Sequence, residues 1–257
     1  MSDAATLNPY DALATFYDDA GFSNYSGAMA PRLINFLQQK GWMGSRILDL
    51  GCGTGMSTAH FAQTGLQTFA MDHSAGMMTM LERRLIGTDY HVELLHQDMR
   101  EVDYPEELDL IFCVGNVLNE VRSMRDLEVV FSRAYKALSP GKIFLFDMTT
   151  IRGLAEQFGN QEHVLEVSDR ILVTVQNFFN YESIAVTQRL ICFVEGNGDG
   201  WQRHDSHLIM RGFPYNPIVK LLEKVGFTAV SAFDSNLRPF DVARDTDGRF
   251  IIVAERN

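Results

Sequence analysis

The chain has 257 residues, of which 46% are hydrophobic, so it is long enough to bury a full core as one domain with an insertion. Its formal net charge of −11 repels polyanions, and its longest basic run is Arg83-Arg84, which argues against nucleic acid or an anionic membrane as a partner. Three cysteines without a Cys-x-x-Cys pair, no basic leader in residues 1 to 9, and no apolar run of about 20 residues predict a cytoplasmic protein that does not enter a membrane.

Residues 10 to 25 are rich in aromatic and acidic side chains, with Phe16-Tyr17-Asp18 at their centre. One interpretation is that these rings only fasten an N-terminal helix to the core. The following residues, 28 to 41, have a broad apolar face at helical spacing and end at Gly41. This pattern predicts the first helix of the main fold.

The next segment, Ile47 to Leu50, is an apolar strand that runs into Gly51-Cys52-Gly53-Thr54-Gly55. Glycines at the end of a strand expose bare backbone, against which a flat nucleoside can lie without meeting a β-carbon. Asp49 could fix this loop by accepting hydrogen bonds from its backbone N–H groups. A dinucleotide fingerprint would need glycine in place of Met56, and a P-loop would need Gly-Lys-Ser/Thr after the glycines. The competing interpretation is a glycine-rich turn of purely structural use.

Two further predicted strands also end in acidic residues. Residues 67 to 71 run into Asp72, and residues 91 to 96 are followed by Gln97-Asp98-Met99. A carboxylate at such a strand end can accept hydrogen bonds from both hydroxyls of a ribose. A single acid there is more often a helix cap or a strand terminator. Their repetition predicts that Asp49, Asp72 and Asp98 meet in one crevice.

Strands and helices alternate along the rest of the chain, which is typical of a doubly wound α/β fold with a mostly parallel sheet. Ser74 is a suitable N-cap for the third helix. The remaining expected helices cover residues 56 to 63, 74 to 85, 125 to 138 and 217 to 225, and the remaining strands cover 108 to 114, 138 to 147, 227 to 233 and 250 to 254.

Over residues 45 to 148 the chain resembles the class I S-adenosylmethionine-dependent methyltransferases. The resemblance rests on the glycine motif, on Met71-Asp72-His73-Ser74, on Gln97-Asp98-Met99, and on the segments expected for strands four and five. It implies a Rossmann-like fold whose seven-stranded sheet has one reversed strand, and S-adenosyl-L-methionine as the cofactor.

The resemblance also implies individual roles. The three glycines would line the adenosyl and methionine portions, Asp72 would bind the ribose, Asp98 would accept from the adenine amine, and Met99 would pack on the ring. Tyr17 would belong to a lid beside the sulfonium, whose charge an aromatic face stabilises, and Tyr25 is a second candidate for that position. The full set of expected cofactor-binding residues is Tyr17, Tyr25, Asp49, Gly51, Gly53, Gly55, Asp72, His73, Asp98, Met99, Cys113 and Asn116.

Residues 150 to 213 separate the fifth strand from the last helix and contain three segments of near-alternating β-branched and aromatic residues. They predict an antiparallel β insertion above the carboxyl edge of the sheet, which would cover the active site. Similar methyltransferases that act on small molecules carry an insertion here. We therefore expect an N-terminal lid at 1–27, a cofactor-binding core at 28–149 and 214–257, and the insertion at 150–213.

The expected catalytic candidates are few. Asn116 follows the fourth strand at the crevice and could orient the acceptor, while Tyr181 and His207, in the insertion, could act as a base or an orienting group. His204 and His207 stand three residues apart on a predicted strand and point to opposite faces, so we expect no metal site.

The sequence thus predicts an enzyme that moves a methyl group from S-adenosylmethionine to nitrogen or oxygen of a small molecule by in-line displacement. We expect a monomer or homodimer. Two alternatives stay open: a module that binds the cofactor without turnover, and an aminopropyltransferase, which would need an acidic cluster to hold a polyamine.

Overall fold

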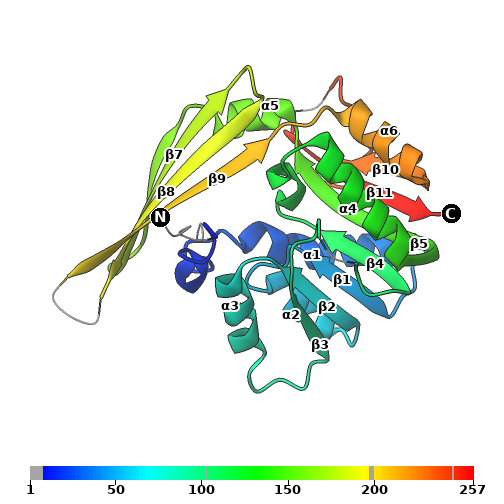
Figure 1. Ribbon diagram of the computed structural model, residues 1–257, viewed down its shortest axis with the longest axis horizontal. Coiled ribbons are helices and arrows are strands. Elements are labelled where there is room, and N and C mark those ends of the chain that lie inside the picture. The colour runs from blue at the N-terminus through cyan, green and yellow to red at the C-terminus, as the bar shows by residue number, and fades with distance from the viewer. Residues whose placement is uncertain (1–7, 102, 197–199, 245) are drawn as a thin grey trace, which may run out of the picture.

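The computed structural model describes residues 8–101, 103–196, 200–244 and 246–257, which form two sheets (Figure 1). The larger sheet has seven strands in the order β10-β11-β5-β4-β1-β2-β3, and the smaller has four in the order β6-β7-β8-β9. The strands of the larger sheet are β1 (Arg46–Leu50), β2 (Gln67–Asp72), β3 (Val92–His96), β4 (Leu108–Cys113), β5 (Leu138–Thr149), β10 (Phe227–Phe233) and β11 (Arg249–Arg256).

In the larger sheet, only β11 runs against its neighbours. Pairing is parallel from β3 across to β5, and antiparallel where β11 meets β5 and β10. This confirms the predicted fold class, a doubly wound and mostly parallel sheet with one reversed strand. Parallel strands all deliver their carboxyl ends to one edge, which is the edge that the predicted site residues follow.

Helices cover both faces of the larger sheet because its inner strands are apolar on both sides. Leu48 and Ile111 face one cluster with α4 and α6, while Ile47 and Leu110 face the opposite cluster with α1. The helices are α1 (Asn24–Gln39), α2 (Met56–Gln63), α3 (Ala75–Leu85), α4 (Met124–Ala137) and α6 (Tyr215–Val225), with the short turns η1 (Ala14–Phe16), η2 (Val117–Glu120), α5 (Ile151–Gly153) and η3 (Leu154–Phe158).

Helix α1 begins four residues earlier than predicted. Its first turn, Asn24 to Gly27, is polar and carries no apolar periodicity, so the sequence pattern did not mark it. Gly27 lies against Met56, where an added β-carbon would come within 3.2 Å of the methionine side chain. The absence of a side chain at this position lets α1 pack closely on α2.

The smaller sheet consists of β6 (Glu162–Ser168), β7 (Ile171–Asn180), β8 (Ala185–Glu195) and β9 (Trp201–Arg211), all antiparallel. Three of these strands were predicted. The prediction missed β6 because it is an edge strand whose apolar pair Val164-Leu165 is exposed and lies between His163 and Glu166. The sheet extends away from the core in Figure 1.

Residues 8–23, which we call the N-terminal segment, lie between the smaller sheet and α3 (Figure 1). Leu13 and Phe16 of this segment are buried against an apolar face of the sheet that includes Val173, Leu190 and Leu208. The segment therefore joins the two sheets. Residues 1–7 of the predicted lid lie outside the described residues.

Candidate functional site

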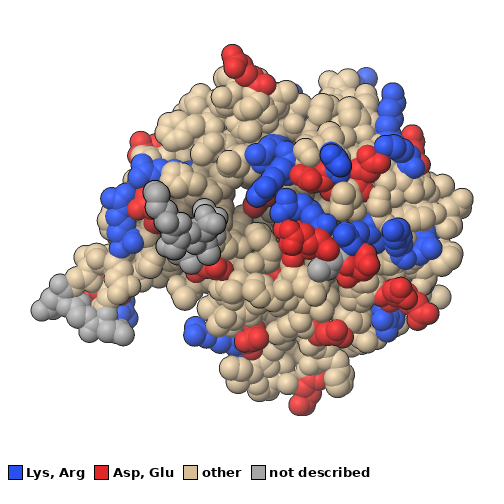
Figure 2. Space-filling model, in the orientation of Figure 1, with Lys and Arg blue, Asp and Glu red and all other residues tan. Residues whose placement is uncertain are grey.

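A cavity of about 350 Å³ opens at the carboxyl ends of β1, β2, β3 and β4. The N-terminal segment forms its outer wall with Tyr10, Tyr17 and Phe22. In Figure 2 the surface is hollowed between the smaller sheet and the core, and Lys and Arg side chains gather at one rim of this hollow. Of the predicted site residues, those that line the cavity are Tyr17, Tyr25, Gly51, Gly53, Asp72, His73, Asp98, Met99 and Asn116.

The glycine loop presents backbone to this cavity. Gly53 has a φ of +55°, and a β-carbon built on it would meet no atom within 4 Å, so the space in front of it is open. Gly51 has a φ of +75°, and its β-carbon would come within 2.4 Å of Val117 on η2. Gly53 thus leaves room for a ligand, whereas Gly51 lets η2 approach the loop.

Three predicted cofactor contacts lie outside the cavity lining. Gly55 packs on α3, where its β-carbon would come within 2.2 Å of Leu81. Asp49 is buried and accepts a 2.6 Å hydrogen bond from the Thr58 hydroxyl of α2, not from the glycine loop. Cys113 is completely buried in the sheet. The side chains of Asp49 and Cys113 are buried by packing, and Leu81 of α3 fills the space beside Gly55. All three residues therefore stabilise the floor of the site.

Asp72 connects the loops that follow β1 and β2. One carboxylate oxygen accepts from the Gly53 backbone N–H at 2.9 Å and the other from the Ser74 N–H at 2.9 Å. Its side chain is 12% exposed, and it lies on the cavity wall beside His73. The carboxylate therefore holds the glycine loop in place and still faces the cavity.

Asp98 and Met99 line the cavity where β3 ends. Asp98 accepts hydrogen bonds from the Arg100 guanidinium at 2.5 and 3.0 Å, and this contact lowers the pKa of its carboxyl. Met99 packs against the larger hydrophobic core next to it. An ionised acceptor and an apolar side chain thus lie side by side at this end of the cavity.

The loop after β4 is held by buried polar groups. Asp147, fully buried on β5, accepts hydrogen bonds from the N–H groups of Gly115 and Asn116 and forms an ion pair with Arg249. The Arg249 guanidinium lies 4.1 Å from the centre of the Tyr25 ring, and both line the cavity. Nothing in the sequence points to Arg249, which is more than 100 residues from its partner Asp147.

The N-terminal segment is bonded to both halves of the site. Asp11 accepts hydrogen bonds from the Ser74 hydroxyl and the Gly76 N–H, at the first turn of α3. Asp18 accepts a hydrogen bond from the Thr54 hydroxyl of the glycine loop and pairs with Arg84 of α3. On the other side, Ser206 of β9 donates a 2.8 Å hydrogen bond to the carbonyl of Pro9.

Residues 47–141 match the family model of a methyltransferase domain. The chain is 28% identical over 219 residues to YqeM of Bacillus subtilis (strain 168), a protein named as a methyltransferase. The aligned residues cover 85% of this chain and 86% of YqeM. The chain is a class I S-adenosylmethionine-dependent methyltransferase. S-Adenosylmethionine is thus its cofactor, and the family favours methyl transfer over aminopropyl transfer.

Solved structures share the fold of this methyltransferase. An S-adenosylmethionine-dependent methyltransferase from Clostridium acetobutylicum ATCC 824 superimposes with a TM-score of 0.82 at 22% identity, covering 96% of this chain and 99% of the other. CalS10, an amino pentose methyltransferase from Micromonospora echinaspora, superimposes with a TM-score of 0.70 at 16% identity over all of both chains.

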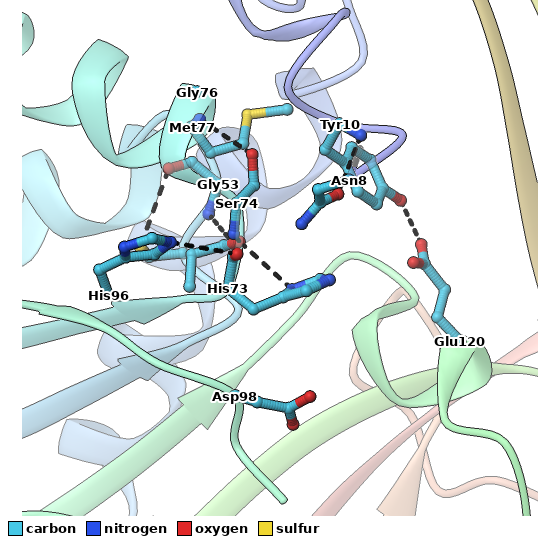
Figure 3. A network of polar contacts seen from close by, with 12 residues as sticks. Asn8, Tyr10, Gly53, His73, Ser74, Gly76, Met77, His96, Asp98 and Glu120 are labelled. Carbon is cyan, nitrogen blue, oxygen red and sulfur yellow. Dashed lines mark hydrogen bonds and ion pairs between the residues drawn. The ribbon is translucent and has the colours of Figure 1, made fainter. Parts of the chain in front are cut away.

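A further titratable pair faces the cavity of the methyltransferase, and the sequence did not identify it as a pair. The Tyr10 hydroxyl donates a hydrogen bond to Glu120 of η2, across 110 residues of sequence (Figure 3). Burial, together with Asp72, raises the pKa of Glu120 to about 7. Tyr10 and Glu120 both line the cavity. The sequence feature that points to Glu120 is its position after β4, at the carboxyl edge of the sheet.

Tyr181 and His207 lie apart from the cavity, contrary to the expected catalytic roles. Tyr181 is 75% exposed beyond the end of β7, where it borders a separate apolar hollow. His207 is exposed on β9, opposite Arg189, while its neighbours Ser206 and Leu208 point to the covered face. His207 points away from the covered face because side chains alternate along β9, and Tyr181 lies past the last residue of β7.

The described part of the methyltransferase contains no group of three His, Cys, Asp or Glu side chains arranged to hold a metal ion. Among the same residues, none of the helices is both long and apolar enough to cross a lipid bilayer.

Proposed function

We propose that this methyltransferase transfers the methyl group to nitrogen or oxygen of a small-molecule acceptor. The observation that carries the proposal is the cavity, which is walled in by the N-terminal segment and has a volume in the range of small-ligand sites. The fold shared with an amino pentose methyltransferase supports it. A polymer would have to displace this wall to reach the glycine loop.

We place the cofactor along the strand ends. The methionine portion lies by Gly51 and Gly53, Asp72 accepts from the ribose hydroxyls, and Asp98 with Met99 binds the adenine. Tyr17, whose ring lines the cavity, lies near the sulfonium, which an aromatic face can stabilise by roughly 0.5–2 kcal/mol. In this arrangement the lid is the N-terminal segment, and the insertion backs it.

The reaction requires alignment more than acid–base chemistry. The acceptor atom attacks the methyl carbon, and the carbon–sulfur bond breaks with its electron pair going to sulfur, which leaves neutral S-adenosylhomocysteine. Positioning of the two reactants and exclusion of water can supply most of the acceleration. Asn116 lines the cavity but its side-chain oxygen already accepts from Thr149, so it contributes its amide group to orienting the acceptor.

Substitution of Asp72 by alanine tests the cofactor placement. We expect S-adenosylhomocysteine to bind more weakly by about 1–3 kcal/mol in calorimetry, because ribose hydrogen bonds and the anchor of Gly53 are lost together. Asp89→Ala, at an exposed position outside the cavity lining, is the matched control. Equal affinity in the two variants would contradict the placement.

The acceptor class is tested with a labelled methyl group. Wild-type protein is incubated with methyl-labelled S-adenosylmethionine and a library of small amines, alcohols and carboxylic acids, with a protein extract and total RNA in parallel. Transfer to an amine or an alcohol is expected. Transfer to protein or RNA alone would overturn the proposal.

A further inference from the structure

Glu120 is placed in the cavity by the geometry of η2. In a 3₁₀ turn, residues three apart lie on the same face. Val117 and Glu120 are such a pair, and Val117 packs directly on Gly51 of the glycine loop. Glu120 therefore faces the cavity beside the place where the methionine end of the cofactor is proposed to lie.

The position of Glu120 is fixed by its neighbour in sequence. Asn119 is fully buried, donates hydrogen bonds to the carbonyls of Thr149 and Arg211, and accepts one from the Thr149 N–H. These bonds attach η2 to the ends of β5 and β9 at once. A carboxyl group on this turn has little freedom to leave the cavity.

The carboxylate of Glu120 is only partly satisfied by protein. Oε1 accepts from the Tyr10 hydroxyl, and within the described part of the chain Oε2 has no hydrogen-bond partner. In Figure 3 the Asn8 amide also points into the space between Tyr10 and His73, and its buried nitrogen has no partner among the described residues. Both groups leave hydrogen-bonding capacity toward the same space.

The surroundings of Glu120 carry negative charge. The titratable groups that face it are Tyr10 from the N-terminal segment and Asp72 from the end of β2, with Tyr17 close enough to interact with both acids. Arg122 lies at the rim of the cavity and is exposed. An anionic acceptor would be repelled from this position, whereas a cationic one would be attracted.

We propose that Glu120 binds the basic nitrogen of an amine acceptor and takes the proton that this nitrogen loses before it attacks the methyl group. The inference rests on the proposed function and narrows its acceptor to amines. An ammonium gives its proton to Oε2, the neutral nitrogen attacks the methyl carbon, and the carbon–sulfur bond breaks with its electrons going to sulfur. The product is the methylated ammonium, and Glu120 releases its proton to solvent when the product leaves.

The proton affinities favour an amine over an alcohol. Burial raises the pKa of Glu120 to about 7, and amines in proteins have pKa values of roughly 8–10. Proton transfer from an ammonium is thus uphill by about one to three powers of ten. For a hydroxyl as weakly acidic as water, with a pKa near 15.7, the deficit is roughly nine powers of ten. A carboxylate can therefore take the proton of an ammonium before attack, whereas an alcohol would have to lose its proton during the attack.

The experiment begins with the wild-type acceptor profile. Initial rates are measured with S-adenosylmethionine and matched primary amines and alcohols of the same carbon skeleton. Methylation of amines in preference to the matched alcohols is expected. If only alcohols or acids are methylated, the inference fails while the proposed function, small-molecule methylation, still holds for alcohols. If no small molecule is methylated, both fail.

Glu120→Gln then tests the residue itself, with Glu223→Gln on the exposed face of α6 as the matched control. General base catalysis contributes on the order of 10²–10⁴-fold, so kcat/KM of Glu120→Gln for an amine should fall by at least 10²-fold at pH 7.5. Calorimetry with S-adenosylhomocysteine should give wild-type affinity, which excludes a folding defect.

The pH profile separates proton transfer from a structural role. Wild-type kcat/KM should decline below about pH 7 and stay level from there to the pKa of the amine, because Glu120 must be ionised while the acceptor is still an ammonium. In Glu120→Gln, only the free amine reacts, so kcat/KM should rise tenfold per pH unit up to the pKa of the amine. Profiles of the same shape in wild type and variant would overturn the inference, as would equal rates.

Discussion

At the scale of single residues, glycines with the same backbone conformation serve different purposes. Gly53 and Gly65 both have positive φ angles, +55° and +83°, and both have open space where a β-carbon would stand. Only Gly53 lines the cavity. Substituting each glycine by alanine therefore distinguishes the effect of backbone strain on stability from the effect of a side chain that fills the ligand space.

We expect Gly53→Ala and Gly65→Ala to lower the free energy of unfolding by similar amounts, about 1–2 kcal/mol, because each forces alanine into the left-handed region. Only Gly53→Ala should also weaken S-adenosylhomocysteine binding. Urea unfolding and calorimetry on both variants check this. Wild-type affinity in Gly53→Ala would show that the cofactor backbone contact lies elsewhere.

Asp49 is a buried acid whose burial raises its pKa to about 7, against roughly 4 in an unfolded chain. The folded state therefore retains a proton that the unfolded state releases. This stabilising contribution is fully present below about pH 4 and is lost as the pH rises through about 7, with a slope of up to about 1.4 kcal/mol per pH unit.

Asp49→Asn removes that ionisation and can still accept from the Thr58 hydroxyl. We expect the free energy of unfolding of this variant to exceed that of wild type increasingly from pH 5 to pH 8. Urea unfolding at four pH values measures the difference, with Asp89→Asn at an exposed position as the control. A constant difference across this range would mean that Asp49 is ionised throughout.

At the scale of elements, η2 shows how one short turn is held by distant strands. Asn119→Ala leaves two carbonyls and one N–H without their partner in a buried setting. We expect a loss of about 1–3 kcal/mol in the free energy of unfolding. Asn216→Ala, exposed at the start of α6, should change it by less than about 0.5 kcal/mol. Similar values for the two variants would contradict this role of Asn119.

The elements that the sequence predicted are those defined by local patterns. Apolar runs that end in an acid or a glycine predicted β1 and β2. Ser74 predicted the start of α3, where its hydroxyl accepts a hydrogen bond from the Met77 N–H. The sequence pattern did not predict β6, because an exposed edge strand needs no alternation of apolar and polar residues. Tyr10 with Glu120, and Asp147 with Arg249, were beyond reach because each pair is made only when segments over 100 residues apart come together.

At the scale of the whole molecule, the fold class and the cavity edge follow from the alternation of strands and helices, whereas the order of the expected lid and insertion above the cavity does not. The position of the insertion suggested that the smaller sheet itself covers the site. Instead the N-terminal segment lies between the sheet and the cavity, with Leu13 and Phe16 buried on the sheet. The insertion therefore contacts the N-terminal segment, and Tyr181 and His207, chosen from the insertion, lie outside the cavity lining.

The placement of β11 between β5 and β10 has a consequence for the order of assembly during synthesis. The ribosome makes β5 and β10 before β11, and both pair only with β11 on that side of the sheet. Neither can form these pairs until Arg249–Arg256 have been synthesised. Until then the long edge of β5 has no partner there, and the Asp147 charge lacks the guanidinium that neutralises it. Nascent chains stalled before residue 249 are therefore expected to be recognised by chaperones and proteases, although the strands that carry the cofactor motifs have already been made.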